Sequence, residues 1–496
     1  MPLTPKAVYE DLRNKDLDHT SAIEILTTLI ENTDNIDTRL ESLNILDKIQ
    51  AKGGRIFKLL ENLLISDSHK DIRNMAALLL KKFFIERALK PMKWAFDHEK
   101  ELECLITIIS TLSEINNMES KSILVNKLYY LYNQENKYNL IYLDKSKAIE
   151  SLKKHEIAEL LINYYFIFSL KKRFGFIKYE FNNSGYITKL DLTNVDTQGI
   201  FLSDFLELIY SLKQLEALDL RFNNLIKLSE ITNESSSLKS LDLSYNKLLS
   251  IPKSIVKIRS LKKLNLKSNR LRSLPNSIKN FSGLETLILR NNILTQIPSS
   301  IKSLKNLRIL DLHGNKLDSF NFILNVSIRE LELGWNNFKE LPKEIKSLTL
   351  LKKLGLSGNK LVSLPKWISV FQSLKSLDLY DNEIYELPNS IGFLKSLEKL
   401  VLRNNHLTIL PDSMKNLENL KILNLSWNNF FSLPEWIGEL SSLEEINLWG
   451  NKLESLPESI CSLSNLKLLD LSFNRFNQFP IILRNLERKN DLIIKL

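Results

Sequence analysis

The sequence predicts an α/β solenoid preceded by an all-α domain, and two observations support this prediction. From residue 187 onward, a unit of about 23 residues recurs with leucines and an asparagine at fixed places. Before residue 174, by contrast, apolar residues follow the spacing of helices and prolines are few. A chain of 496 residues, with 44% apolar and 25% charged residues, is long and apolar enough to fold into both parts.

The repeating block, counted from its first leucine, has apolar residues at places one, four, six and eleven and an asparagine at place nine. Places four and six, with polar residues between them, show the period of two that is typical of a short strand with one buried face. One block buries too little apolar surface to be stable alone, so each strand is expected to stack on the next copy. The block begins thirteen times, at Ile187, Leu215, Leu238, Leu261, Leu284, Leu307, Ile328, Leu351, Leu374, Leu397, Leu420, Leu443 and Leu466.

The asparagine at place nine lies where the chain turns from the strand into the interior. A side-chain amide there can pair with backbone groups that the turn would otherwise leave buried and unpaired. We therefore expect an asparagine ladder with a structural role. The ladder comprises Asn223, Asn246, Asn269, Asn292, Asn315, Asn336, Asn359, Asn382, Asn405, Asn428, Asn451 and Asn474.

Two blocks depart from the pattern. The first is longer and has Val195 at place nine, as is typical of a terminal unit. The sixth is short, and residues 318–327 replace its usual Leu-Pro segment, which indicates either repeat decay or a kink or partner site. Segments 174–181 and 491–496 have strand-like patterns, and we expect both to cover the open edges of the parallel sheet.

A complete block reads Leu351, Leu354, Leu356, Asn359 and Leu361, and continues into Leu364, Pro365 and Ile368. Over residues 187–485 this consensus resembles the leucine-rich repeat family and is similar to its intracellular Ras-group type. The resemblance implies a horseshoe of about 13 repeats with a parallel sheet on its concave face. It also implies a non-catalytic scaffold or adaptor in intracellular signalling, with a small GTPase or a phosphatase as the partner.

Segments 22–50 and 55–85 align with each other as pairs of helices joined by short turns. The order Asp71, Ile72, Arg73 opens the later helix and resembles HEAT repeats, in which the Asp and Arg bridge neighbouring repeats. Further pairs are expected around 89–117 and 119–168, and a helical domain of another type is the alternative. The sequence therefore predicts three parts, which are a HEAT-like domain at 1–173, a strand cap at 174–186 and a leucine-rich repeat domain at 187–496.

Charge and cysteine usage narrow the functional classes. The formal net charge of +10 is modest, and lysines alternate with acidic residues, so no specific nucleic-acid binding is expected. Cys104 and Cys461 lie in different halves, which favours a reducing compartment over the disulfide-capped extracellular repeats. From the sequence we expect neither a signal peptide nor a run long enough to span a bilayer. We expect a monomeric cytoplasmic protein without a transmembrane segment.

No catalytic constellation is recognisable in the sequence. The six histidines are scattered singly, without metal-ligand spacing or a nucleophile motif, so we expect no enzyme activity, metal or cofactor. An effector-type ubiquitin ligase is the enzyme alternative, because that family also joins leucine-rich repeats to a helical domain. Its helices follow the repeats and carry a Cys-x-Asp motif, whereas here the helices come first and Cys104 is followed by Leu105 and Ile106.

The concave face is therefore the candidate binding surface, since places three, five and seven point outward there. Aromatic residues and an arginine, the types most frequent at binding hot spots, gather in the C-terminal blocks. A second group forms a basic stripe nearer the N-terminus, which suggests salt-sensitive binding of a polyanion or a membrane surface as another alternative. The candidate protein-binding residues are Tyr380, Arg403, Trp427, Trp449 and Trp335, and the basic stripe is Arg221, Lys267, Arg290 and His313.

Both surfaces also have a purely structural interpretation. Acidic residues at place five, such as Asp219 and Asp311, would neutralise part of the basic stripe. Aromatic residues at place eight would stack on their neighbours. Trp367 and Trp436, in the outer segments, are expected to pack on the convex side.

Overall fold

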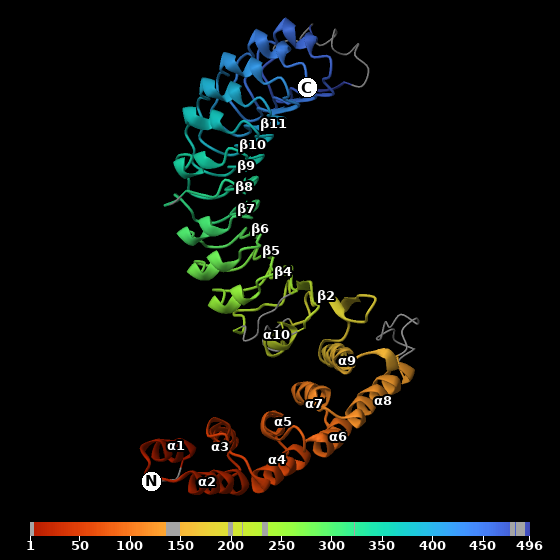
Figure 1. The fold of residues 1–496 in the computed structure, drawn as a ribbon. Helices are drawn as coiled ribbons and strands as arrows, with labels where there is room; N and C mark the ends of the chain where they lie inside the picture. The colour runs from red at the N-terminus through yellow and green to blue at the C-terminus, as the bar shows by residue number, and fades with distance from the viewer. Residues whose placement is uncertain are drawn as a thin grey trace. The chain divides into compact units, whose positions relative to one another are not determined.

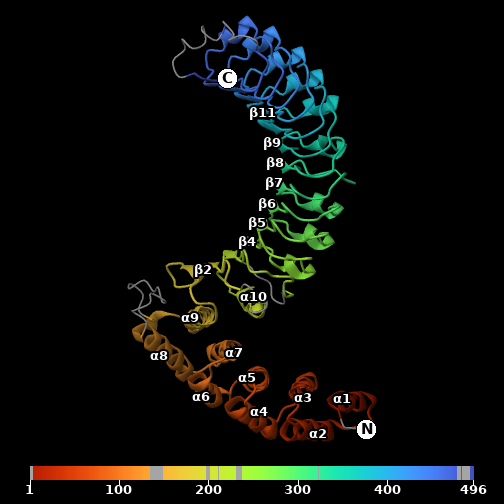
Figure 2. The same ribbon diagram turned by 180° about the vertical axis from the view of Figure 1, so that it is seen from behind.

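The computed structural model describes residues 4–134, 149–196, 202–210, 212–230, 237–321, 323–476, 482 and 492–496. The chain forms two compact units, Met1–Thr188 and Lys189–Leu496. The first unit is built mainly of helices and the second of short strands and turns (Figures 1 and 2).

The helices of the first unit form pairs that stack in two rows (Figure 1). Helices α3, α5, α7 and α9 make one row, and α2, α4 and α6 contact them from the other. The helices are α1 (Pro5–Asn14), α2 (His19–Asn32), α3 (Ile36–Lys48), α4 (Gly54–Ser66), α5 (Lys70–Phe84), α6 (Leu89–His98), α7 (Leu102–Glu114), α8 (Met118–Gln134) and α9 (Lys154–Phe174), with the short 3-10 helix η1 (Ile149–Ser151).

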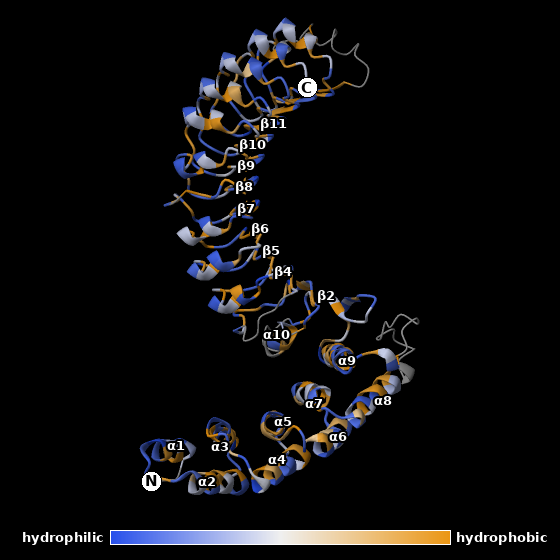
Figure 3. Ribbon diagram, viewed as in Figure 1, coloured by the Kyte–Doolittle hydropathy of each residue, from blue (hydrophilic) through white to orange (hydrophobic). Residues whose placement is uncertain are grey.

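This arrangement agrees with the helical pairs expected from the sequence. The two aligned segments are α2–α3 and α4–α5, and α4 and α5 each carry hydrophobic and hydrophilic residues along their length (Figure 3). The apolar residues of α4, including Leu60, Leu63 and Leu64, are buried. Among the described helices, none combines the length and the apolarity needed to cross a membrane.

Polar bridges join successive helix pairs. Arg39 of α3 donates to the carboxylate of Asp67, and Arg73 of α5 donates to both oxygens of Glu99 at 2.8 and 2.9 Å. Burial opposes ionisation of Glu99, but the bonds from Arg73 and from backbone N–H groups outweigh it and lower its pKa to about 2. The arginine part of the expected bridge is present. The acid comes from the turn before the second helix of the next pair, and Asp71 takes no part in these bridges.

The sheet of the second unit is parallel from β2 to β15, and each strand pairs only with its sequence neighbours. Places three to five form the strand in each block after the first, where β2 covers places one to five, and β1 lies beside β2 at the start of the sheet. The strands are β1 (Lys178–Phe181), β2 (Ile187–Asp191), β3 (Ala217–Asp219), β4 (Ser240–Asp242), β5 (Lys263–Asn265), β6 (Thr286–Ile288), β7 (Ile309–Asp311), β8 (Glu330–Glu332), β9 (Lys353–Gly355), β10 (Ser376–Asp378), β11 (Lys399–Val401), β12 (Ile422–Asn424), β13 (Glu445–Asn447), β14 (Leu468–Asp470) and β15 (Ile493–Lys495).

Short 3-10 helices line the convex side, opposite the strands (Figure 1). Each begins after the proline of a Leu-Pro or Ile-Pro segment, because proline fixes φ near the value that the helix entry needs. Pro388, for example, has φ −72° and is followed by the buried Ile391. These helices are η2 (Lys253–Lys257), η3 (Asn276–Asn280), η4 (Ser299–Ser303), η5 (Lys343–Ser347), η6 (Lys366–Val370), η7 (Asn389–Phe393), η8 (Asp412–Asn416), η9 (Glu435–Glu439) and η10 (Glu458–Ser462).

The asparagine ladder is present and joins neighbouring repeats. The Nδ2 of Asn382 donates to the carbonyls of Leu379 in its own block, at 3.1 Å, and of Leu356 in the preceding block, at 3.0 Å. Its Oδ1 accepts the backbone N–H of Leu361 at 3.1 Å. The same bonds recur from Asn246 to Asn474, so the ladder is structural.

The atypical ends are also accounted for. The backbone N–H groups of Val195 and Asp196 donate to Oδ1 of Asn223, so the ladder extends back into the first block although place nine there is Val195. That block also contains an α-helix, α10 (Leu202–Tyr210). Strand β15 pairs in parallel with β14, as expected of the last segment, although Asp491 lies outside the described residues.

The strand expected at 174–181 is shorter than predicted. Phe174 ends α9, and the chain leaves the helix at Gly175, whose φ of 77° a residue without Cβ adopts easily. Only Lys178–Phe181 forms a strand. In the sixth block no 3-10 helix forms among the described residues of 318–327, which exclude 322.

Candidate functional site

The turn after each strand places one residue of every block in an unusual backbone conformation. Place eight has positive φ throughout, from 52° at Trp335 to 71° at Gly450. Glycine, asparagine and aspartate tolerate this left-handed region, whereas a bulky side chain is strained there. Yet five blocks carry an aromatic residue at place eight, each at least 38% exposed. These residues are Phe222, Tyr245, Trp335, Trp427 and Phe473.

Two of these aromatic residues belong to a continuous group at the C-terminal end of the concave face. Trp449 lies at the centre of this group, with its ring edge-to-face with Trp427 at 5.0 Å and with Phe473 at 5.7 Å. The guanidinium of Arg403 lies 5.6 Å from the Trp449 ring and 5.5 Å from the Tyr380 ring. We call these five residues, Tyr380, Arg403, Trp427, Trp449 and Phe473, the C-terminal aromatic patch.

The structure agrees in part with each of the two interpretations of the aromatic residues, stacking and binding. The rings do contact one another, as the structural interpretation expected. They also remain accessible: Trp427 is 48% exposed and Phe473 is 79% exposed. Packing between repeats would not require bulky residues at a strained position, because glycine or asparagine serves at place eight in the neighbouring blocks.

Trp335 lies apart from this patch. It belongs to the block of β8, two blocks before that of Tyr380, and no described aromatic ring is in contact with it. Its indole lies against Gly358 of the next block, where a Cβ atom would approach within 2.6 Å of the ring. The glycine thus makes room for the tryptophan, which stays 49% exposed.

The N-terminal part of the concave face has a different character. Phe222 and Tyr245 are stacked with ring centroids 4.4 Å apart, and the Lys267 amine lies 5.1 Å from the Tyr245 ring. Arg221 is already occupied, because its guanidinium contacts both oxygens of Asp219 at 2.7 to 2.9 Å. Two members of the predicted basic stripe, Arg221 and Lys267, are therefore engaged by neighbouring side chains.

The remaining members of the stripe, Arg290 and His313, lie beside each other. Burial, followed by the positive charges of Arg290 and Lys267, lowers the pKa of His313 to about 4. This imidazole is therefore neutral at pH 7. The stripe carries less positive charge than its sequence indicates.

The acidic residues at place five have a local structural task. Asp219, Asp242 and Asp378, for example, each accept the backbone N–H of place seven at about 3.0 Å. This bond closes the turn that ends the strand. Burial raises the pKa of two acidic residues in the middle of the face, Asp311 and Glu332.

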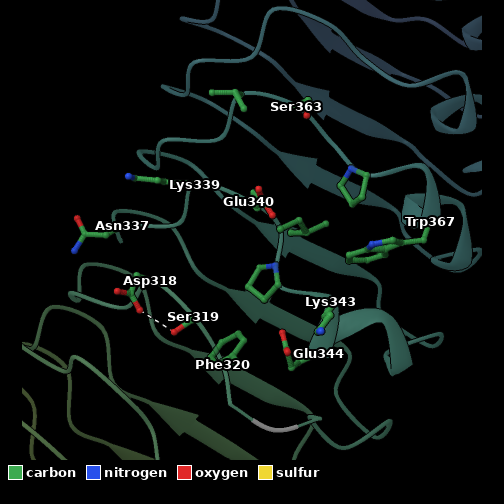
Figure 4. A pocket seen from close by; sticks show the side chains of 14 residues that line it. Asp318, Ser319, Phe320, Asn337, Lys339, Glu340, Lys343, Glu344, Ser363 and Trp367 are labelled. Carbon is green, nitrogen blue, oxygen red and sulfur yellow. Dashed lines mark hydrogen bonds between the residues drawn. The ribbon is translucent and has the colours of Figure 1, made fainter.

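The two convex tryptophans differ although they occupy equivalent places. Trp436 is 9% exposed, and its indole N–H donates to Asp412 of the preceding block at 3.1 Å. Trp367 is half-buried and lines a hollow of about 860 Å³ beside the irregular sixth block (Figure 4). Lys343 occupies, relative to Trp367, the place that Asp412 occupies relative to Trp436. Trp367 therefore has no equivalent bond.

Neither the geometry that a nucleophilic cysteine needs nor that of a metal site is found among the described residues. The thiol of Cys104 is buried in α7, and burial raises its pKa, which suppresses the thiolate that a nucleophile needs. Within the described ranges, no group of histidine, cysteine or acidic side chains is arranged to hold a metal ion.

Family models match most of the second unit. They describe a leucine-rich repeat region at residues 295–404 and leucine-rich repeats at 213–271, 259–317, 396–417, 419–440 and 434–476. The chain belongs to the leucine-rich repeat family. Its fold is that of protein-interaction modules, and this family is typically non-catalytic.

Several solved structures are similar to this chain. A leucine-rich repeat protein of Leptospira interrogans is 31% identical over 62% of this chain and 90% of that protein, with a TM-score of 0.47. An internalin, InlF of Listeria monocytogenes, is 21% identical over 63% and 90%, with a TM-score of 0.52, and supports the fold alone. PEPR1, solved in complex with AtPEP1, is 28% identical over 67% of this chain and 51% of its own, with a TM-score of 0.52. None of the curated proteins matches the chain.

Proposed function

We propose that this leucine-rich repeat protein is a non-catalytic scaffold that binds a folded protein at the C-terminal aromatic patch. The single observation that supports this proposal most is the accessible chain of aromatic rings around Arg403. Tryptophan, tyrosine and arginine supply much of the binding energy at protein interfaces, because they present large rigid surfaces with polar edges.

The strained backbone at place eight adds to this argument. Trp427 and Phe473 occupy left-handed positions where asparagine or glycine would be more stable. A sequence that keeps bulky exposed rings at such positions gives up stability, and binding of a partner is a reason to retain them. The partner implied by the family resemblance is a small GTPase or a phosphatase acting in intracellular signalling, in the cytoplasm.

Affinity capture from native lysate at moderate salt tests this proposal. The wild type is compared with a variant carrying Tyr380→Ala, Arg403→Ala, Trp427→Ala and Trp449→Ala, and captured proteins are identified by mass spectrometry. A matched control, Phe222→Ala with Tyr245→Ala, removes exposed rings from the other end of the same face. Circular dichroism melts establish that both variants remain folded.

We expect one specific protein to be lost from the quadruple variant and retained by the control. If the folded quadruple variant captures the same proteins as the wild type, the patch is not the interface. Capture of salt-sensitive nucleic acid or lipid alone would instead support the polyanion or membrane-surface alternative. Capture with unchanged partners but with thiol-dependent ubiquitin transfer would support the ligase alternative, which the buried Cys104 disfavours.

A further inference from the structure

Strand β11 presents an unusual combination of side chains on the concave face. Its places three, five and seven are Lys399, Val401 and Arg403, two cations around an apolar residue. Lys399 and Arg403 are both exposed. Neither forms an ion pair with a carboxylate among the described residues, in contrast to Arg221 and Lys353 elsewhere on the face.

Neighbouring rings hold the guanidinium of Arg403 in place, but its N–H groups have no hydrogen-bond acceptor among the described residues. The rings of Tyr380 and Trp449 lie 5.5 and 5.6 Å from it, which restricts the side chain. A guanidinium held against aromatic rings keeps its planar fork of donors available for a carboxylate, and its restriction lowers the entropy lost on binding.

Acidic residues near Arg403 are either engaged or distant. Asp378, in the preceding block, accepts the backbone N–H of Tyr380 at 3.0 Å. Asp381, also in that block, accepts from the amide of Asn404. Across places three, five and seven of β11, β12 and β13, the only acidic residue is Glu445. Over β11, β12 and β13 these three places carry two cations and one acid, a net charge of +1, and Asp378 and Asp470 occupy place five of the flanking strands β10 and β14.

The middle of the concave face is different, since Asp311 and Glu332 lie there on β7 and β8. Their carboxylates would repel an acidic ligand, although the Lys353 amine, 2.8 Å from Glu332, offsets part of that charge. An acidic segment would consequently be favoured over β11, β12 and β13, between Asp378 and Asp470. There Trp427, Trp449 and Phe473 offer apolar surface directly beside the two cations.

From this geometry we infer that the C-terminal aromatic patch binds an extended acidic segment of a partner protein. A side-chain carboxylate of the segment accepts two hydrogen bonds from Arg403, with Lys399 beside it. A neighbouring apolar side chain of the segment packs on Trp427 and Trp449. This inference rests on the proposed function, and it adds the chemistry by which the partner is recognised.

A random-peptide display library is the probe for this inference. Peptides are selected on the wild type after removal of those that bind a Trp427→Ala, Trp449→Ala variant. We expect the retained peptides to be enriched in aspartate and glutamate beside apolar residues. Selection on Arg403→Glu is expected to reverse the preference towards lysine and arginine.

A double-mutant cycle then locates the carboxylate contact. The affinity of one selected peptide is measured with its aspartate and with asparagine in its place, on wild type and on Arg403→Gln. The asparagine peptide is expected to bind wild type about tenfold more weakly than the aspartate peptide does. On Arg403→Gln the two peptides are expected to bind equally well, because that variant has already lost the bidentate contact. Arg403→Lys is expected to recover only part of the affinity, since lysine lacks the planar fork.

Arg221→Gln is the matched control, because Asp219 already occupies that guanidinium. The peptide should bind this variant as it binds wild type. Absence of acidic enrichment, failure to recover any peptide that depends on the two tryptophans, or a cycle without coupling would each overturn the inference. The proposed function would survive those results if the quadruple alanine variant still lost its captured protein, so the two failures are distinguishable.

Discussion

The two ends of the concave face use the same residue types with different consequences. Near the N-terminus, Phe222 stacks on Tyr245 and Arg221 is bound by Asp219. Near the C-terminus, Arg403 lies between two rings and has no carboxylate partner among the described residues. The difference arises at place five, which is Asp219 in one block and Val401 in the other. Place five therefore supplies a carboxylate partner for the arginine in the block of Arg221 and none in the block of Arg403.

The largest expected effect concerns partner binding. Trp427→Ala combined with Trp449→Ala should weaken the partner's affinity by about 3 kcal/mol or more, because these rings form the centre of the patch. Phe222→Ala with Tyr245→Ala should change the affinity by less than about 0.5 kcal/mol, since those rings lie at the other end of the face. Calorimetric titration with the captured partner measures both. Equal losses in the two variants would remove the distinction between the ends.

The next effect concerns the ladder that supports the C-terminal end. Asn382→Ala should lower the free energy of unfolding by roughly 1 to 3 kcal/mol, because it leaves the buried Leu361 N–H without an acceptor and removes one of two amide donors from the carbonyls of Leu356 and Leu379. Asn359→Ala should have a similar effect. The control is Asn404→Gly, an exposed place-eight substitution expected to change stability by less than about 0.5 kcal/mol. Urea denaturation provides the comparison, and an unchanged midpoint in both ladder variants would contradict the structural role of the ladder.

A smaller effect tests the backbone strain. Phe473→Asn should raise the free energy of unfolding by about 1 kcal/mol, since asparagine tolerates φ 56° and the ring is 79% exposed. The same variant should bind the partner less tightly. Thermal melts and titrations give the two quantities. A loss of stability would show that the ring contributes more to packing than the left-handed backbone costs.

The smallest effect concerns pH in the middle of the concave face, where His313 lies. The folded-state pKa of His313, about 4, lies below the ordinary value of 6.5, so the unfolded chain binds more protons between those values. Its contribution to stability is complete above about pH 6.5 and is lost as pH falls towards 4. His313→Gln should therefore reduce the acid sensitivity, by less than about 1 kcal/mol because the side chain is partly solvated. Denaturation midpoints from pH 7 to 4 test this, and identical pH profiles would contradict it.

Much of the fold follows from the sequence because the repeat leaves few alternatives. The leucines at places four and six define the strands, and the asparagine at place nine defines the ladder, so thirteen blocks give β2 to β14. The helix pairs were also predictable from their apolar stripes. Helix α10 was missed, because the long first block has no repeat to compare with, and the bridging acids Asp67 and Glu99 were missed because turns have no fixed register.

The candidate surface was only partly predictable. The sequence identifies Tyr380, Arg403, Trp427 and Trp449, but it does not reveal which of them touch, and the structure separates Trp335 from them. Phe473 is at place eight, where the sequence predicts stacking on neighbouring rings, and its 79% exposure follows only from the structure. Lys399 and Val401 could have been found by reading places three, five and seven together. The neutral state of His313 depends on burial, which no repeat pattern shows.

Site-specific photo-crosslinking tests the central claim most directly, because it reports contact without removing the aromatic patch. A photoreactive phenylalanine analogue replaces Phe473 at the C-terminal end or Phe222 at the N-terminal end, and native lysate is irradiated with each protein. We predict a discrete crosslinked partner from position 473 and none from position 222. A partner crosslinked from 222 alone would contradict the assignment of the interface to the C-terminal end.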